Sequence, residues 1–364
     1  MTGKRQLFAV LVLLVFALAG EVLAGQWLTR PQSVTFDTRF GFTMRPGARL
    51  VQSREGWGTY RANSYGFADD EFVPPPGSTA GVLLGDSFGQ GFQVRYGQRF
   101  SEVVEREVPG VSLLNASAAG RSQIHYALFA PRFEAAFHPR FFVMQVNDAD
   151  LSELEGAAAW RTALDEFHGT GAAASLASGQ RERAGWSPRA LLRRSSLLHL
   201  LFTRTSDLFS QERTRLTRKL TGVKADLRDV VAAPVTPRTA ALADSLTGVV
   251  QAVNPNLILL YIPHIAYFSA PPHVAYPERR AFYHALAARR GVPLVDPTDA
   301  MLESYAHDHE PLHGFLDTKP GEGHLNARGH AVVGRLLAAE IARELKPAGR
   351  LNALAPARSP EVVR

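Results

Sequence analysis

The chain of 364 residues contains no cysteine, which excludes a disulfide framework, thiol catalysis and thiolate metal sites. It also lacks the glycine motifs that bind phosphate. A Walker loop needs Lys-Ser/Thr after its second glycine, and Phe92-Gln93 follow Gly91 here. No G-x-G-x-x-G opens a helix, and no internal repeat is visible. Nucleotide-binding and repeat architectures are therefore disfavoured.

Positive charge is concentrated in one segment. Between Arg181 and Lys224 there are 11 Lys or Arg and three acidic residues, a local +8 within a total of +6, which leaves about −2 elsewhere. No aromatic residues alternate with these bases and no binding motif is present, so no nucleic-acid partner is expected. Anionic lipid or an anionic envelope polymer is the more natural partner. A solvated helix face is an equal alternative.

The N-terminus reads as an export signal. Lys4 and Arg5 precede an apolar run from Leu7 to Gly20 that continues through Ala24. Cleavage after Ala24 is compatible with the small residues there. The apolar stretch through Leu28, however, approaches the roughly 20 residues that span a bilayer, which favours an uncleaved anchor. We expect residues 1–28 to be the signal peptide or anchor, with the rest on the periplasmic or extracytoplasmic face.

Residues 29–78 predict an irregular or short-stranded extension that ends in a Pro74–Gly77 cluster. From residue 79, apolar runs alternate with amphipathic segments, as in parallel βαβ units. The five runs begin at Ala80, Val111, Phe141, Asn256 and Val292. This pattern predicts a three-layer α/β/α sandwich with a five-stranded parallel sheet over 79–345.

The interval between the third and fourth runs is much longer than a normal crossover. We therefore expect an insertion at about 151–235, with a helix starting near Ser187-Pro188. This insertion carries the basic cluster, which would suit an amphipathic surface helix, although packing on the main domain is the favoured alternative. The Pro- and Ala-rich tail 346–364 is expected to be disordered.

Chemically suited residues follow three of the predicted strands. Ser87 lies in the turn after the first, Gly120 follows the second and Asn147 ends the third. Because the carboxyl ends of parallel strands share an edge, these residues should converge there. Ser87 is the candidate nucleophile. The backbone N–H groups of Ser87 and Gly120 and the Asn147 amide are candidate oxyanion donors. His324, just before the last helix, is the candidate base.

Taken singly, Ser87 could be a helix cap and Asn147 a turn residue. All four in order, in the blocks GDSF, NASAAG, VND and HLNARGH, resemble the SGNH/GDSL hydrolase superfamily over about residues 80–345. The resemblance implies a flavodoxin-like fold and a serine esterase that needs no cofactor or metal. Asn63 to Phe67 is similar to an N-x-x-G-F segment of membrane-anchored bacterial members.

One position departs from the family pattern. The usual Asp three residues before the His is replaced by Gly321. Glu322, two residues before His324, is then the candidate triad acid, at a spacing similar to the D-x-H of polysaccharide O-acetyltransferases. Asp317 is the alternative acid, and a backbone carbonyl is a third means of orienting the ring. Asp86 is expected to fix the turn.

The predicted function is serine-dependent ester hydrolysis through an acyl-enzyme in the cell envelope. An O-acyltransferase or deacetylase of envelope polysaccharide is the alternative, with an acyl ester or acetylated carbohydrate as substrate. A degenerate glycan-binding domain is a third, and a Glu322 turned away from His324 would favour it. The His- and Glu-rich stretch 307–313 matches no strong metal-ligand spacing, so a solvated loop is expected there.

Overall fold

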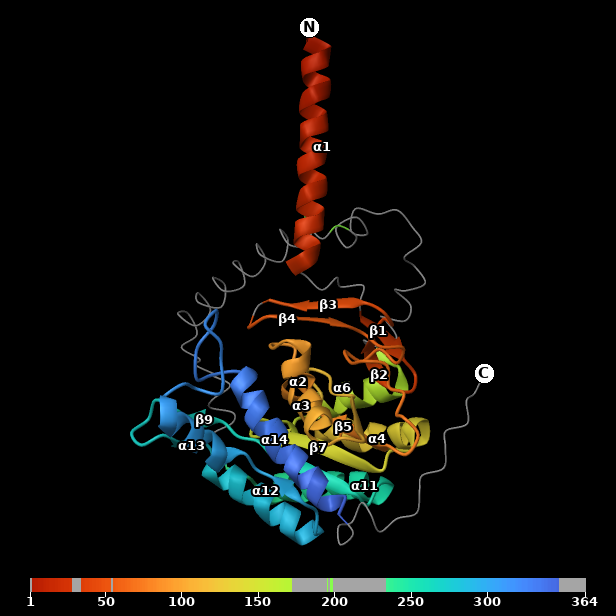
Figure 1. Cartoon of the computed structure of the whole chain (residues 1–364). Coiled ribbons are helices and arrows are strands. Elements are labelled where there is room, and N and C mark those ends of the chain that lie inside the picture. Colours follow the sequence, from red (N-terminus) through yellow and green to blue (C-terminus); the bar gives the residue numbers. More distant parts are fainter. Residues whose placement is uncertain are drawn as a thin grey trace.

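We describe the protein from a computed structural model, in which residues 2–27, 34–53, 55–171, 195, 197–198 and 234–346 are described. The helix expected near Ser187 and the tail after residue 346 lie outside these residues. The basic cluster also lies outside them, except for residues 195 and 197–198. Helix α1 (Thr2–Trp27) extends away from the domain on the side where strands β3 (Arg49–Gln52) and β4 (Gly58–Arg61) lie (Figure 1). By length and composition alone, Lys4–Gly25 could cross a membrane, with a mean hydropathy of 2.7.

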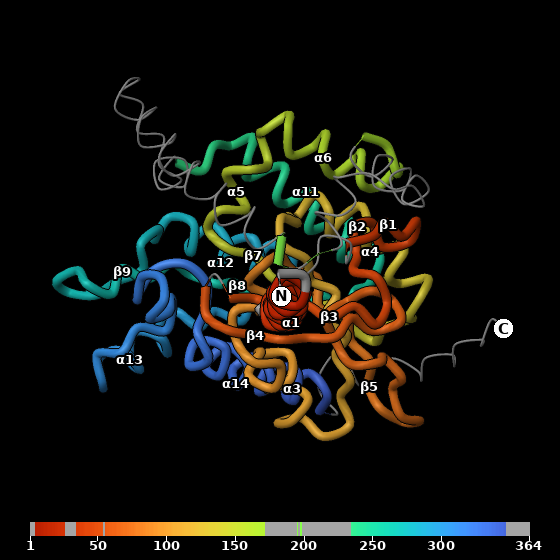
Figure 2. Tube along the Cα trace, turned by 90° about the horizontal axis from the view of Figure 1, so that it is seen from above, coloured from red at the N-terminus to blue at the C-terminus, as the bar shows by residue number. Residues whose placement is uncertain are grey.

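The chain after α1 forms two short antiparallel hairpins. The first pairs β1 (Val34–Asp37) with β2 (Gly41–Met44), and the second pairs β3 (Arg49–Gln52) with β4 (Gly58–Arg61). Leu50 and Tyr60 of the second hairpin are buried against Phe92 and Tyr96 of the main domain. Seen from above, this hairpin lies beside the base of α1 (Figure 2). The extension is therefore packed on the domain.

The central sheet has five strands, all parallel, in the order β11-β8-β7-β5-β6. Their bounds are β5 Thr79–Leu84, β6 Val111–Asn115, β7 Phe141–Asn147, β8 Leu257–Ile262 and β11 Leu294–Val295. The five apolar runs thus form the predicted sheet. A two-stranded ribbon, β9 (Ile265–Ala266) with β10 (His273–Val274), follows β8.

Alternate residues of each central strand enter two separate cores. Phe142 and Met144 of β7 belong to one, and Phe141 and Val143 to the other. The first core is covered by α4 (Gln123–Phe137), α11 (Pro237–Val253) and α12 (Pro277–Arg290). The second is covered by α3 (Phe100–Glu107), α13 (Thr298–Asp308) and α14 (Ala327–Glu344). Helices therefore cover both faces of the parallel sheet, as burial of such a sheet requires. This confirms the predicted α/β/α sandwich.

Helix α3 ends at Glu107, with Pro109-Gly110 following its cap at Val108. In α14, Val333, Leu337 and Ile341 recur at every fourth position and are fully buried. The other elements of the described residues are α2 (Ser87–Gln90), the 3₁₀ turn η2 (Tyr96–Gln98), α5 (Asp150–Glu153) and α6 (Ala157–His168). Helices α5 and α6 occupy the start of the predicted insertion.

Candidate active site

Ser87 is the first residue of α2, directly beyond the carboxyl end of β5. Asp86 caps this short helix, since its Oδ1 accepts the N–H of Phe88 at 2.8 Å. From the adjacent strand β7, Gln145 Oε1 accepts the N–H groups of Asp86 at 3.0 Å and Gly89 at 3.2 Å. The turn that presents the serine hydroxyl is therefore held from both its own cap and the sheet. Asp86 fixes the turn, as the sequence suggested.

His324 meets this serine from the other end of the chain. Its Nε2 lies 2.8 Å from Ser87 Oγ, although 237 residues separate them. The loop that carries His324 is closed by backbone bonds from Gly314 N to His324 O, 2.8 Å, and from Asn326 N to Leu312 O, 3.1 Å. Asn326 also caps α14 with its side chain. The imidazole thus belongs to a hydrogen-bonded loop just before a helix with one buried face.

The carboxylate on the far side of the ring belongs to Glu55, in the turn between β3 and β4. Glu55 Oε2 lies 2.6 Å from His324 Nδ1, and Oε1 accepts the backbone N–H of His324 at 2.9 Å. With Nδ1–H donating to Glu55, the neutral ring offers its Nε2 lone pair to the Ser87 hydroxyl. Glu55, His324 and Ser87 form one continuous hydrogen-bonded chain.

This arrangement corrects the acid predicted from the sequence. Glu322 pairs with Lys319 at the surface, and Asp317 accepts the N–H of Gly56 at 3.0 Å. The reason is Gly323, whose φ of +86° turns the chain between Glu322 and His324. A Cβ at Gly323 would collide with Glu55 Oε1. Glycine there leaves room for the distant carboxylate while Glu322 points elsewhere.

No spacing along the chain connects Glu55 to His324, because 269 residues separate them and Glu55 lies in the predicted extension. A weak local signal is the pair of glycines beside it. Gly56, at φ +65°, packs against Gln93 O and Phe315, and Gly58 packs against Phe92 O and Val94 O. Asp317, the alternative acid, instead holds the Glu55 turn in place through Gly56.

Burial and hydrogen bonding act on the pKa of Glu55 in opposite directions. Burial of Glu55 opposes its ionisation, but the hydrogen bonds from the His324 side chain and backbone outweigh it, so the pKa of Glu55 lies below its ordinary value. The side chains of Glu55 and His324 are 19% and 25% exposed. Glu55 is thus poised to remain ionised and to stabilise an imidazolium.

Asn147 is fixed beside the nucleophile turn. Its Nδ2 donates to Asp86 Oδ2 at 2.7 Å, and its Oδ1 accepts the N–H of Ala149 at 2.7 Å. An amide nitrogen carries two hydrogens, so one remains for a developing oxyanion. Gly120 lies in the exposed loop between β6 and α4, with φ +83° and open space where a Cβ would stand. Within the described part of the chain, no hydrogen bond joins Gly120 to Ser87.

Two buried carboxyls lie beneath Asn147. Burial raises the pKa of Asp86 despite its hydrogen bonds, and burial together with the charge of Asp86 raises the pKa of Asp150 well above its usual range. Asp150 accepts the backbone N–H of Asn147 at 2.8 Å. Asn147 is therefore held by hydrogen bonds to two buried carboxyls, and ionising both carboxyls at once is energetically unfavourable.

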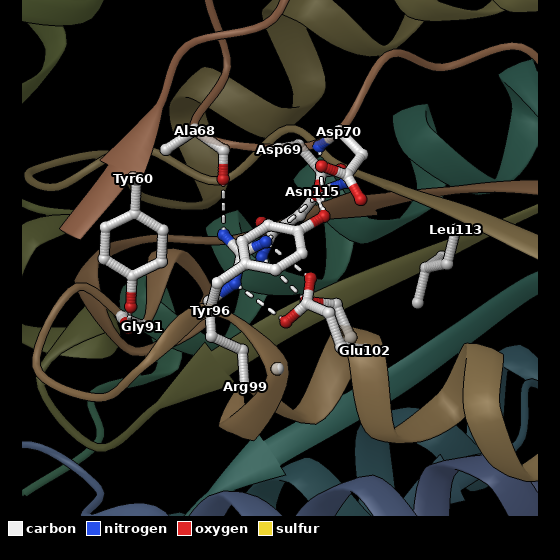
Figure 3. Close-up of polar contacts among 12 residues, drawn as sticks. Tyr60, Ala68, Asp69, Asp70, Gly91, Tyr96, Arg99, Glu102, Leu113 and Asn115 are labelled. Carbon is white, nitrogen blue, oxygen red and sulfur yellow. Dashed lines mark hydrogen bonds and ion pairs between the residues drawn. The ribbon is translucent and has the colours of Figure 1, made fainter. Parts of the chain in front are cut away.

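Two residues just after the N-x-x-G-F segment connect the extension to the main domain (Figure 3). Ala68 O and Asp69 Oδ1 accept hydrogen bonds from the buried Arg99 at 2.6 and 3.0 Å. Asp69 Oδ2 accepts the N–H of Asn115 at 2.8 Å. The Asn115 side chain in turn donates to Gly89 O at 2.9 Å. A polar chain thus runs from the extension that carries Glu55 to the helix that begins with Ser87.

The stretch 307–313 has structural contacts. Asp308 and Glu310 both pair with Arg328 on α14, and His313 is buried with its Nδ1 2.9 Å from Tyr267 Oη. Within the described ranges, no group of three or more His, Asp or Glu side chains is arranged to hold a metal ion. His330, on α14, is buried with its Nδ1 accepting from Phe100 N at 3.3 Å.

No family model and no curated protein matches the chain, but solved structures do. The chain resembles lipolytic proteins of the G-D-S-L family. One, from Veillonella parvula, is 12% identical with TM-score 0.38, over 73% of this chain and all of that one. A lipase/acylhydrolase from Enterococcus faecalis is 15% identical with TM-score 0.37, over 74% and 98%. A catalytic mutant of an acetylxylan esterase from Geobacillus stearothermophilus is 13% identical with TM-score 0.37, over 74% and 96%. At these identities and scores, the likenesses do not by themselves assign a function.

Proposed function

We propose that this protein is a serine-dependent ester hydrolase of the SGNH type that acts through an acyl-enzyme on Ser87. The observation that carries the proposal is the Glu55–His324–Ser87 chain, with links of 2.6 and 2.8 Å. A nucleophile, a base within hydrogen-bond reach and a group that orients the base are the three parts such catalysis needs. The site lies at the carboxyl edge of the parallel sheet, where α/β folds bind ligands.

In the proposed reaction, Ser87 Oγ attacks the ester carbonyl carbon while His324 Nε2 takes the hydroxyl proton. The negative charge on the carbonyl oxygen would be met by the N–H of Ser87 and the free N–H of the Asn147 amide, with Gly120 as a further donor. His324 then gives its proton to the departing alkoxide, which leaves as the alcohol. Glu55 stabilises the imidazolium during both steps.

The acyl-enzyme is resolved when His324 deprotonates a water molecule that attacks the Ser87 ester, releasing the carboxylic acid and restoring the serine. If an acceptor hydroxyl takes the place of water, the same steps perform O-acyl transfer, the alternative function. The degenerate binding domain was to be favoured by a Glu322 turned away from His324. Although Glu322 is turned away, Glu55 supplies the carboxylate, so we propose an active enzyme and not a degenerate binding domain.

We also propose that α1 tethers the enzyme to a membrane and places the domain outside the cytoplasm. Its stretch Lys4–Gly25 is only 6% buried, so the described part of the chain leaves most of this apolar surface uncovered. The contact of α1 with β3 would put the hairpin bearing Glu55 on the membrane side of the domain (Figure 1).

A fluorophosphonate probe tests the chemistry without knowledge of the substrate, because it labels only activated serines. In detergent, the full-length chain should be labelled at Ser87 and should hydrolyse a simple aryl acetate. Ser87→Ala and His324→Ala should do neither. Labelling that survives in Ser87→Ala, or hydrolysis unaffected by either change, would contradict the proposal.

A further inference from the structure

A second carboxylate–imidazole pair lies at the same edge of the sheet. Asp148 follows β7 and His264 follows the neighbouring strand β8. Asp148 Oδ2 lies 3.2 Å from His264 Nδ1 and accepts the backbone N–H of His264 at 2.8 Å. Its other oxygen accepts from Tyr261 Oη at 2.6 Å. The carboxylate is fully buried and takes no part in the Glu55–His324–Ser87 chain.

This pair sets the orientation and tautomer of His264. With Nδ1–H donating to Asp148, the neutral ring presents a lone pair at Nε2. The side chain is 36% exposed, and none of the described residues forms a hydrogen bond with its Nε2. His264 therefore offers a fixed hydrogen-bond acceptor to whatever approaches this edge.

The ring of Phe88, the residue after the nucleophile, connects His264 to the active site. Its centroid lies 5.0 Å from that of His324 and 6.2 Å from that of His264. The centroid of the Tyr276 ring, at the start of α12, lies 6.0 Å from that of His264. A polar acceptor is thus flanked by two aromatic rings one side chain away from Ser87.

We propose that His264, Phe88 and Tyr276 form a subsite for the alcohol part of the ester, and that this alcohol is a sugar. The proposal rests on the ester-hydrolase function proposed above. A sugar presents apolar C–H faces, which pack on aromatic rings, beside hydroxyl groups, which need an acceptor. A few convergent polar groups on an apolar lining are what gives a binding site its specificity. His264 is a specificity-determining residue and takes no proton in the reaction.

The alternative is that Asp148 and His264 only stabilise the fold. A second pair in the chain, His284 and Asp296, provides a control for it. His284 Nε2 lies 2.7 Å from Asp296 Oδ2, and this pair joins α12 to the end of β11, at the sheet margin. Like His264, His284 is a partly exposed imidazole held by a well-buried carboxylate. It is separated from β5, the strand of Ser87, by β8 and β7. His284→Phe is therefore a matched control for loss of an imidazole that contacts a buried carboxylate.

The test compares two substrates with the full-length protein in detergent. One is an aryl acetate, whose alcohol part has no hydroxyl, and the other is a partly acetylated xylo-oligosaccharide with free hydroxyls. His264→Phe keeps a ring but removes the acceptor. We expect it to lower kcat/KM for the sugar ester by about 10-fold, mainly through KM, while the aryl ester changes less than about 2-fold. His264→Gln, which keeps an oxygen acceptor, should recover part of the loss, and His284→Phe should behave as wild type.

Tyr276→Leu provides a second variant should His264→Phe fold poorly, and it should raise KM for the sugar ester alone. Equal losses on both esters, or no loss on the sugar ester, would overturn the subsite. Wild type that cleaves the aryl ester but no sugar ester would also overturn it, while leaving the hydrolase function intact. Absence of hydrolysis together with absence of Ser87 labelling would instead show that the proposed function itself has failed.

Discussion

Glu55 Oε2 lies 2.6 Å from His324 Nδ1, across 269 positions of sequence. The contact joins a hairpin of the N-terminal extension to the loop before the last helix, so the extension completes the proposed active site. The same extension contacts α1 and is held to the domain by Arg99 and Asp69. Loss of the extension should therefore remove catalysis and leave the parallel sheet complete.

Glu55→Gln should lower kcat by about 10³- to 10⁴-fold, because an amide favours the wrong tautomer of His324 and cannot stabilise the imidazolium. Glu322→Gln is the matched control, since its carboxylate pairs with Lys319 at the surface, and it should keep nearly full activity. Aryl acetate hydrolysis and fluorophosphonate labelling measure both. If Glu322→Gln were the inactive variant, our placement of the triad acid would be wrong.

Gly323→Ala should lower kcat by about 10²-fold, because its Cβ would displace the Glu55 carboxylate from the His324 ring. Gly77→Ala is the control. Its φ of +82° is close to the +86° of Gly323, but no atom lies within 4 Å of its Cβ position. Both variants should lose a similar amount of stability from backbone strain, about 1–2 kcal/mol, measured by urea unfolding. Equal activities of the two variants would show that Glu55 does not need this space.

Asn147→Ala should lower kcat by about 10²- to 10³-fold with little change in KM, as expected for loss of one oxyanion donor. The change also removes the hydrogen bond to Asp86, so the melting temperature must be measured in parallel. A variant that is well folded and still has wild-type kcat would exclude Asn147 from the site.

His313 and His330 should each lower the stability of the fold as the pH drops below about 6.5. Burial lowers the pKa of His313 and of His330 from 6.5 to about 3, with smaller contributions from neighbouring charges. Between these values the unfolded chain binds protons that the folded chain does not, so acid favours unfolding by about 1.4 kcal/mol per pH unit for each group. His330→Gln should reduce this slope by one proton, while exposed His273→Gln should not. Urea unfolding at several pH values provides the measurement, and an unchanged slope in His330→Gln would disprove the assignment.

The local sequence was sufficient to predict that Ser87, Asn147 and His324 lie near one edge of the sheet. Ser87 and Asn147 follow apolar runs whose length and composition specify buried parallel strands, and such strands end at a common edge. His324 precedes a helix with apolar residues at every fourth position, and this apolar face must pack on the sheet. These are properties of neighbouring residues, and they follow from periodicity and burial alone.

The acid of the triad was decided only by the tertiary structure. Glu322 is next but one to His324 in sequence, yet the positive φ of Gly323 turns its side chain to Lys319. Glu55 reaches the ring because Leu50 and Tyr60 bury the hairpin on the domain and Asp317 holds its turn. Packing of an extension against a loop depends on shape and on backbone hydrogen bonds between distant segments, which leave no periodic trace in the chain. The same holds for His264 and Asp148, which meet only because β7 and β8 are neighbours in the sheet.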